Sequence, residues 1–210
     1  MKKLFLTSAF TEVAALLAAT VNEDLQGKTV TFIPTASIPE SVTFYVGAGK
    51  RALKKLGLIV DELELTTAST EEIAQKLKAN DYIYVTGGNT FFLLQELKRT
   101  GADKILIEQI NNGKLYIGES AGSIIMASQI EYVKDMDDCS EAKDLEDFSA
   151  LNIVDFYPLP HHTNFPFKKA VEKIIAKYET ELKLYPFSNS QVLFVDGASG
   201  KEIEVITKQK

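Results

Sequence analysis

Three small residues at alternate positions, Gly118, Ser120 and Gly122, form a Gly-x-Ser-x-Gly pattern within the stretch LYIGESAGSII. An apolar strand-like run precedes the pattern and an apolar helical run follows it. This is the strand–turn–helix context of a nucleophile elbow, in which a tight turn exposes the serine hydroxyl at the end of a strand. The alternative is that the small residues only let a helix pack closely on a sheet. With its flanking segments, the pattern predicts Ser120 as a nucleophile.

A serine hydroxyl is a weak nucleophile unless a base accepts its proton. The chain has two histidines, His161 and His162, directly after an expected strand at 152–159. They should therefore emerge at a sheet end, as Ser120 does. Adjacent histidines point in different directions and no further Cys/His cluster accompanies them, so no metal site is expected. One of these two histidines is therefore a candidate for the general base.

The base in turn needs an orienting carboxylate. Asp196 ends the apolar run SQVLFVD, and Asp135 follows soon after the elbow helix. Each has a simpler explanation, because Asp-Gly pairs are common in turns and Asp135 lies in an acidic loop. Both residues are candidates for the third member of the site.

A second glycine turn, Gly87-Gly88-Asn89, connects a strand at 82–86 to a helix that begins near Thr90. Backbone N–H groups in such turns can point into a cleft. Gly88 and Ala121 are therefore the expected oxyanion donors. Asn89 is a candidate for substrate contact, with helix capping as its alternative role. The stretch VGAGKRA is not a P-loop, because it lacks the first glycine and the Ser/Thr of that motif.

Short apolar runs alternate with helical patterns along the chain. Such strands, apolar on both faces and separated by helices, indicate βαβ units around a parallel sheet. The predicted strands cover residues 3–7, 29–35, 58–65, 82–86, 114–118, 152–159, 190–196 and 201–207. The predicted helices lie near 11–24, 40–56, 70–79, 90–99, 102–112, 121–128 and 165–180. The sequence DGASG between the last two strands predicts a hairpin, so the sheet would end antiparallel.

The composition is that of an ordinary globular protein, and a single domain over 1–210 is the economical interpretation. The net charge of −6 and the lack of any Lys/Arg block disfavour nucleic acid and anionic membranes as partners. The lone Cys139 cannot form an internal disulfide, and the N-terminal apolar stretch is interrupted by polar residues, unlike a signal peptide. We expect a cytoplasmic protein. Its oligomeric state stays open, with a homodimer as one possibility.

Two segments are expected at the rim of the site, and the first of them lacks strand periodicity. The first is acidic and runs over residues 133–149, with the sequence VKDMDDCSEAKDLEDFS. The second runs over residues 34–49, with the sequence PTASIPESVTFYVGAG. Both would allow only small substrates to enter the site.

The combination of these motifs, in this order over most of the chain, resembles the peptidase E family of α-aspartyl dipeptidases, with cyanophycinase as a more distant relative. The resemblance is carried by GGNTFFLLQEL at 87–97, YIGESAGS at 116–123, KDM at 134–136, LNIVDFYPLPHHTN at 151–164 and VDGAS at 195–199. It implies a flavodoxin-like three-layer α/β sandwich, akin to class I glutamine amidotransferases, with a mostly parallel sheet and the C-terminal hairpin. It implies no cofactor.

The resemblance assigns roles to individual residues. Ser120 matches the family's nucleophile. His161, which follows a proline and precedes x-Thr-Asn, matches its histidine, whereas His162 does not. Asp196 occupies the place of the triad acid, and Asp135 matches a second aspartate linked to activity. Gly88 and Ala121 match the oxyanion-hole positions.

The segment after His161 departs from the family, because it has no arginine that could clamp a substrate carboxylate. Lys168 or Lys169 could substitute as point charges. Glu119 places a carboxylate next to Ser120, where it would disfavour an acidic substrate group. Preference for an aspartyl residue therefore stays open.

The function implied is a serine exopeptidase that cleaves dipeptides or short peptides through a Ser-His-Asp mechanism. The alternative is a catalytically silent protein that binds a peptide or another small molecule in the same pocket. A glutaminase-like subunit is disfavoured, because such enzymes carry a cysteine at the elbow and Cys139 lies elsewhere.

Overall fold

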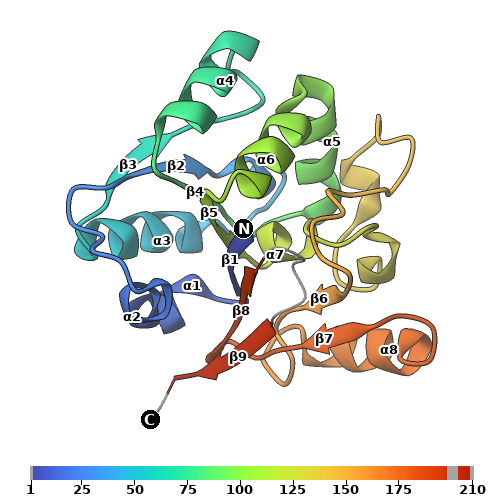
Figure 1. Ribbon diagram of the computed structural model, residues 1–210. Coiled ribbons are helices and arrows are strands. Elements are labelled where there is room, and N and C mark those ends of the chain that lie inside the picture. The colour runs from blue at the N-terminus through green and yellow to red at the C-terminus, as the bar shows by residue number, and fades with distance from the viewer. Residues whose placement is uncertain (1, 198–202, 209–210) are drawn as a thin grey trace.

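The computed structural model describes residues 2–197 and 203–208. Within these ranges a seven-stranded sheet has the order β3-β2-β4-β5-β1-β8-β9 (Figure 1). The first five strands in this order are parallel, while β8 runs antiparallel to both β1 and β9. The strands of the sheet are β1 (Lys2–Thr7), β2 (Thr29–Ile33), β3 (Ile59–Glu62), β4 (Tyr82–Val85), β5 (Leu115–Glu119), β8 (Gln191–Gly197) and β9 (Ile203–Thr207).

Helices cover both faces of this sheet. On one face lie α4 (Thr70–Ala79), α5 (Thr90–Thr100) and α6 (Ala102–Asn111); on the other lie α1 (Phe10–Val13), α2 (Leu17–Val21) and α3 (Phe44–Lys55) (Figure 1). Two further helices, α7 (Ala121–Ile124) and α8 (Lys168–Tyr178), lie toward the C-terminal half of the chain. The expected three-layer α/β sandwich is confirmed, and β8 with β9 supplies the antiparallel C-terminal pair.

Each central strand contributes to two separate apolar cores because successive side chains point to opposite faces. In β1, Leu4 and Leu6 belong to the core under α4, α5 and α6. Phe5, between them, belongs to the core under α1, α2 and α3. This is why the predicted strands are apolar without alternation: both of their faces are buried.

The single helix predicted at 11–24 is divided into α1, a 3-10 turn at Ala14–Leu16 and α2. Two further expected elements, in the second half of the chain, also differ from the structure. The helix predicted at 121–128 is the single turn α7, Ala121–Ile124. The strand predicted at 152–159 is reduced to β6 (Tyr157–Leu159), which pairs with β7 (Leu184–Pro186) outside the main sheet. The cause is local, because the backbone N–H groups of residues 151–154 bond to carbonyl groups of residues 125–127 instead of a neighbouring strand. These bonds consume the donors that a sheet would require.

The DGASG turn predicted between the last two strands lies mostly outside the described residues. No helix of the described part of the chain is both long and apolar enough to span a membrane.

The packing of α7 on the sheet depends on Gly122. A Cβ atom at this position would lie 2.4 Å from the carbonyl oxygen of Val85 in β4, which is too close for any side chain. We predict that Gly122→Ala lowers the free energy of unfolding by about 1–3 kcal/mol, because neither backbone can move away cheaply.

The matched control is Gly47→Ala in the interior of α3, where the nearest atom to a new Cβ is the flexible end of Arg51 at 3.3 Å. There alanine should stabilise the helix by about 0.5–1 kcal/mol. Urea unfolding of both variants measures the difference. Equal stability of the two would contradict the close approach of α7 to β4.

Candidate active site

The carboxyl ends of three neighbouring parallel strands, β4, β5 and β1, meet at one edge of the sheet. The residues that follow these ends are the glycine turn at Gly87, Ser120 and Ser8, and all three line one pocket. Parallel α/β sheets place their ligands at this edge because the loops that follow adjacent strands converge there.

Ser120 occupies a strained turn between β5 and α7, with φ 48° and ψ −107°. Its backbone N–H donates to the Thr7 carbonyl at 2.9 Å, and its own carbonyl accepts from the N–H groups of Ser123 and Ile124. A Cβ at Gly118 would lie 2.7 Å from the Gly122 carbonyl oxygen, so the turn can close only with glycine there. Such strain persists only where the surroundings fix the backbone. The turn has the features of a nucleophile elbow.

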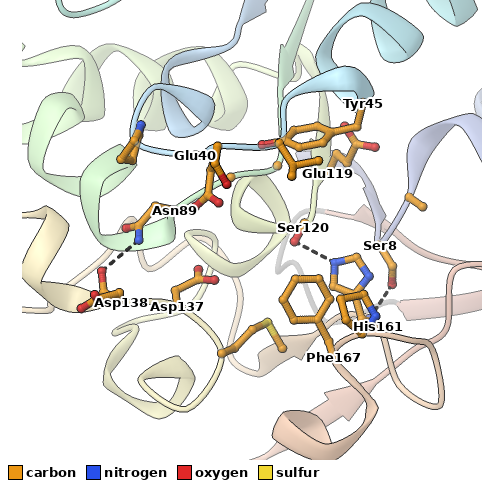
Figure 2. A pocket seen from close by; sticks show the side chains of 18 of the residues that line it. Ser8, Glu40, Tyr45, Asn89, Glu119, Ser120, Asp137, Asp138, His161 and Phe167 are labelled. Carbon is orange, nitrogen blue, oxygen red and sulfur yellow. Dashed lines mark hydrogen bonds between the residues drawn. The ribbon is translucent and has the colours of Figure 1, made fainter.

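The side chain of Ser120 meets that of His161 across 41 residues of sequence (Figure 2). Ser120 Oγ lies 2.9 Å from His161 Nε2. On the other side of the ring, Nδ1 lies 2.9 Å from Oδ1 of Asn189. Because this amide oxygen can only accept, it selects the tautomer with hydrogen on Nδ1. The lone pair of Nε2 then faces the Ser120 hydroxyl.

Ser8 holds the histidine loop in place. Its Oγ accepts a hydrogen bond from the backbone N–H of His161 at 3.0 Å and lies 3.1 Å from the Phe187 carbonyl oxygen. The Asn189 loop is tied to the same segment, because Asn164 Oδ1 accepts from the Asn189 N–H at 2.9 Å. The end of β1, the histidine loop and the Asn189 loop therefore form one hydrogen-bonded unit.

The imidazole of His161 stacks on Phe167, with ring centroids 4.7 Å apart and an angle of 28° between the rings. Burial lowers the pKa of His161 below its usual range, and the hydrogen bond with Asn189 opposes this shift only in part. Burial disfavours the charged form of the ring. The neutral ring, which is the form that can accept a proton, is thereby favoured.

Asp196 does not reach His161, and Asn189 stands where the triad acid was expected. The reason is the direction of β8, which runs antiparallel to β1. Val192 pairs with Thr7 at the site edge, whereas Asp196 pairs with Lys3 near the opposite edge. Four strand residues separate these positions, or about 13 Å. The residues before β8, not those after it, therefore lie beside the histidine.

Asp135 does not reach the site either. Its carboxylate pairs with Lys173 of α8 at 2.5 Å, outside the pocket. Its neighbour Asp137 faces the pocket instead and accepts hydrogen bonds from the N–H and hydroxyl of Thr90. Burial raises the pKa of Asp137 to about 6, and the nearby charge of Glu40 adds to the shift.

Glu119 lines the pocket but its carboxylate is engaged inside the fold. Oε1 accepts from the Phe10 N–H at 2.9 Å and Oε2 from the Tyr84 hydroxyl at 2.8 Å. The residue is 4 % exposed, and burial raises its pKa although these hydrogen bonds oppose the shift. Both oxygens are therefore used to anchor α1 and β4 beside the elbow.

Asn89 is likewise occupied by the fold. Its Oδ1 caps α5 by accepting from the Phe92 N–H, and its Nδ2 donates to the Asp138 carbonyl. It lines the pocket, as does Gly88, whose φ of 133° and approach to Ala36 exclude a side chain. Ala121 follows Ser120 directly in the chain, at the start of α7. Gly88 lines the same pocket as Ser120, and the role of Gly88 and Ala121 as oxyanion donors stays a prediction.

Lys168 and Lys169 begin α8 and are not among the lining residues of the pocket. Lys168 lies 3.8 Å from Glu172 on its own helix. His162 also lies outside the lining, and its backbone N–H donates to the Phe187 carbonyl. The lysines therefore supply no positive charge to the described pocket.

The pocket around Ser120 and His161 has a volume of about 620 Å³. Both segments expected at its rim contribute: residues 39–42, 44 and 45 on one side, and 136–138 and 141 on the other. Figure 2 shows Glu40, Asp137 and Tyr45 around the space beside Ser120. The volume suits a small molecule of dipeptide size.

Three residues of the site, Asn189, Ser8 and Phe167, were not predicted from the sequence. Nothing local marks Asn189, which sits in the ordinary loop sequence FSNSQ. Only the strand topology could have placed Asn189 at the site. If β8 runs antiparallel to β1, the loop before β8 reaches the carboxyl edge of β1. Ser8 follows the first strand directly and could have been placed at that edge by the same argument.

The model of peptidase family S51 matches residues 4–203 of the chain. An uncharacterized peptidase of Listeria monocytogenes, Lmo0363, is 56% identical over 209 residues, covering 100% of this chain and 99% of the relative. An uncharacterized peptidase of Pasteurella multocida, PM1590, is 53% identical over 196 residues, covering 93% of this chain and 94% of the relative. Peptidase E of Shewanella sp. strain ANA-3 is 34% identical over 134 residues, which is 64% of this chain and 53% of the relative.

Among solved structures, a protein of Listeria monocytogenes EGD-e assigned to peptidase E superposes with a TM-score of 0.94. It is 54% identical, and the match covers 100% of both chains. A peptidase from an acI-B1 actinobacterium has a TM-score of 0.64 at 18% identity, covering 100% of this chain and 96% of that one, and shares the fold. The family match extends over nearly all of the chain and includes the serine elbow. The chain therefore belongs to peptidase family S51 and is a serine peptidase.

Proposed function

We propose that the protein is a serine exopeptidase that hydrolyses dipeptides or short peptides with Ser120 as nucleophile and His161 as general base. The observation that supports this most directly is the 2.9 Å contact between Ser120 Oγ and His161 Nε2 in a pocket of about 620 Å³. Asn189 replaces the expected Asp196 as the group that positions the imidazole.

In the proposed reaction Nε2 of His161 removes the proton from Ser120 as Oγ attacks the scissile carbonyl carbon. The N–H groups of Gly88 and Ala121 stabilise the negative oxygen of the tetrahedral intermediate. His161 then gives the proton to the departing amine, which leaves an acyl group on Ser120. A water molecule, activated by the same nitrogen, hydrolyses this ester and restores the serine.

Asn189 gives this arrangement one property that a carboxylate would not. The amide oxygen fixes the tautomer and orientation of the ring but carries no full charge to stabilise the imidazolium that forms during attack. Burial keeps the pKa of His161 below its usual range, and the hydrogen bond to Asn189 offsets this less than a carboxylate would. We propose that the site operates with a weakly basic histidine.

We predict that Ser120→Ala reduces kcat/KM for X-Leu dipeptides by about a thousandfold or more, because no other group can form the acyl intermediate. Ser41→Ala, at the exposed rim of the same pocket, is the matched control and should retain most of the activity. Turnover is followed by release of free leucine. Unreduced hydrolysis in the Ser120 variant rules out this nucleophile.

A fluorophosphonate probe separates the peptidase from the silent binding protein that the sequence left as an alternative. The peptidase should form a covalent adduct at Ser120, located by peptide mass mapping, and Ser120→Ala should not. An unmodified protein that still binds peptides would favour the binding function.

We predict that Asn189→Asp shifts the acidic limb of the kcat/KM profile to higher pH by about 1–2 units, since a nearby carboxylate favours the imidazolium. The native limb should lie below about pH 6.5, the ordinary pKa of histidine, because burial lowers the pKa of His161. Activity rises with pH as the ring loses its proton. An unchanged limb in Asn189→Asp would show that residue 189 does not contact the ring in the active enzyme.

A further inference from the structure

The charges that line the active-site pocket have one sign. Among the described residues, every charged side chain in the lining is a carboxylate, from Glu40, Glu119, Asp137, Asp138 and Glu141. No lysine or arginine is part of this described lining, and the lysines at the start of α8 lie outside it. A negatively charged substrate group would therefore enter a repulsive field.

The carboxylates differ in whether they are available to a substrate. Those of Glu119 and Asp138 accept hydrogen bonds from within the fold, the former from Phe10 and Tyr84 and the latter from the Ser140 N–H. Glu40 and Glu141 are exposed at the rim, where partial burial of Glu40 and the nearby charge of Glu141 raise the pKa of Glu40. They come from the two opposite rim segments. Their carboxylates can therefore face a group held between those segments.

Asp137 and Tyr45 continue this set toward Ser120. One carboxylate oxygen of Asp137 is bound to Thr90, and Figure 2 shows the carboxyl group turned toward the space between Glu40 and Ser120. The hydroxyl oxygen of Tyr45 is buried and has no hydrogen-bond partner within the described part of the chain. Buried polar atoms are normally paired, so an unpaired one in a pocket marks a place for a ligand's donor.

Burial raises the pKa of the Tyr45 phenol, and the negative charges of Glu40, Glu119 and Asp137 add to the shift, so the phenol stays neutral. A neutral phenol oxygen can accept a hydrogen bond but adds no positive charge. The set therefore offers carboxylates and a neutral hydrogen-bond acceptor to one bound group. An ammonium or guanidinium group complements this arrangement. These carboxylates line the same pocket as Ser120.

We propose that the pocket selects peptides whose N-terminal residue is lysine or arginine, with the cationic side chain held between Glu40, Glu141 and Asp137. This inference rests on the proposed peptidase function of Ser120 and adds its substrate class. The long aliphatic stem of such a residue would pass over the apolar lining formed by Val42, Phe44 and Met136.

The test compares Lys-Leu with norleucyl-leucine, which has the same aliphatic chain without the terminal ammonium, and with Asp-Leu. We expect kcat/KM for Lys-Leu to exceed that for norleucyl-leucine by about fivefold or more, the scale of one partly exposed ion pair. Asp-Leu should be the poorest substrate. Equal rates for Lys-Leu and norleucyl-leucine, or a preference for Asp-Leu, would overturn the proposal.

Variants locate the effect. Glu40→Gln and Glu141→Gln should each lower kcat/KM for Lys-Leu by up to about fivefold more than kcat/KM for norleucyl-leucine. The matched control is Glu146→Gln, in the same acidic segment but outside the active-site lining, which should change neither substrate. Equal effects of the three variants would show that the rim carboxylates do not select the cationic side chain.

Calorimetric binding of the same dipeptides to Ser120→Ala separates this proposal from the proposed function. Tighter binding of Lys-Leu than of norleucyl-leucine supports the cation site even if no dipeptide is hydrolysed, in which case the peptidase proposal alone fails. Equal binding overturns the cation site whatever the turnover.

Discussion

The hydroxyl group of Ser8 is the contact on which the assembly of the site depends. It accepts from the N–H of His161 and lies within hydrogen-bond distance of the carbonyl groups of Phe187 and Ser188. One buried atom thus joins the end of β1 to two loops that come from a different, two-stranded sheet. The geometry between Ser120 and His161 is set by this junction, because the two residues share no regular element. A polar group buried in this way is most stable when all of its partners are present.

The strained backbone of Ser120 is held in place by close packing on the other side of the turn. Ser120 keeps its unusual backbone conformation because α7 is locked onto the sheet by the contact of Gly122 with Val85. Glu119 adds a second lock through its bonds to Phe10 and Tyr84. The buried carboxylate therefore serves the architecture, and the acidic character of the pocket comes from the rim.

Much of the fold could be predicted from the sequence, because strands buried on both faces leave a clear signal and most of the helices between them are long and periodic. The elbow at Ser120 and the histidine at His161 were also predictable, since each follows directly from a strand end. The error at Asp196 has a physical cause: a strand's residues do not reveal its direction, and only the direction decides which of its ends meets the site. Asn189 lies before β8 and could be found only after pairing was known. The strand predicted to begin at residue 152 does not form there, because the N–H groups of its first residues bond to carbonyl groups in the turn after α7.

The neutral amide of Asn189 affects the two steps of the proposed reaction, attack and amine expulsion, in opposite ways. Burial lowers the pKa of His161, so its imidazolium is a stronger acid than that of a free histidine. In the proposed reaction this eases expulsion of the amine from the intermediate and makes the initial attack on the carbonyl carbon harder. Such a catalyst would suit substrates with a poor leaving group and a carbonyl that is already polarised.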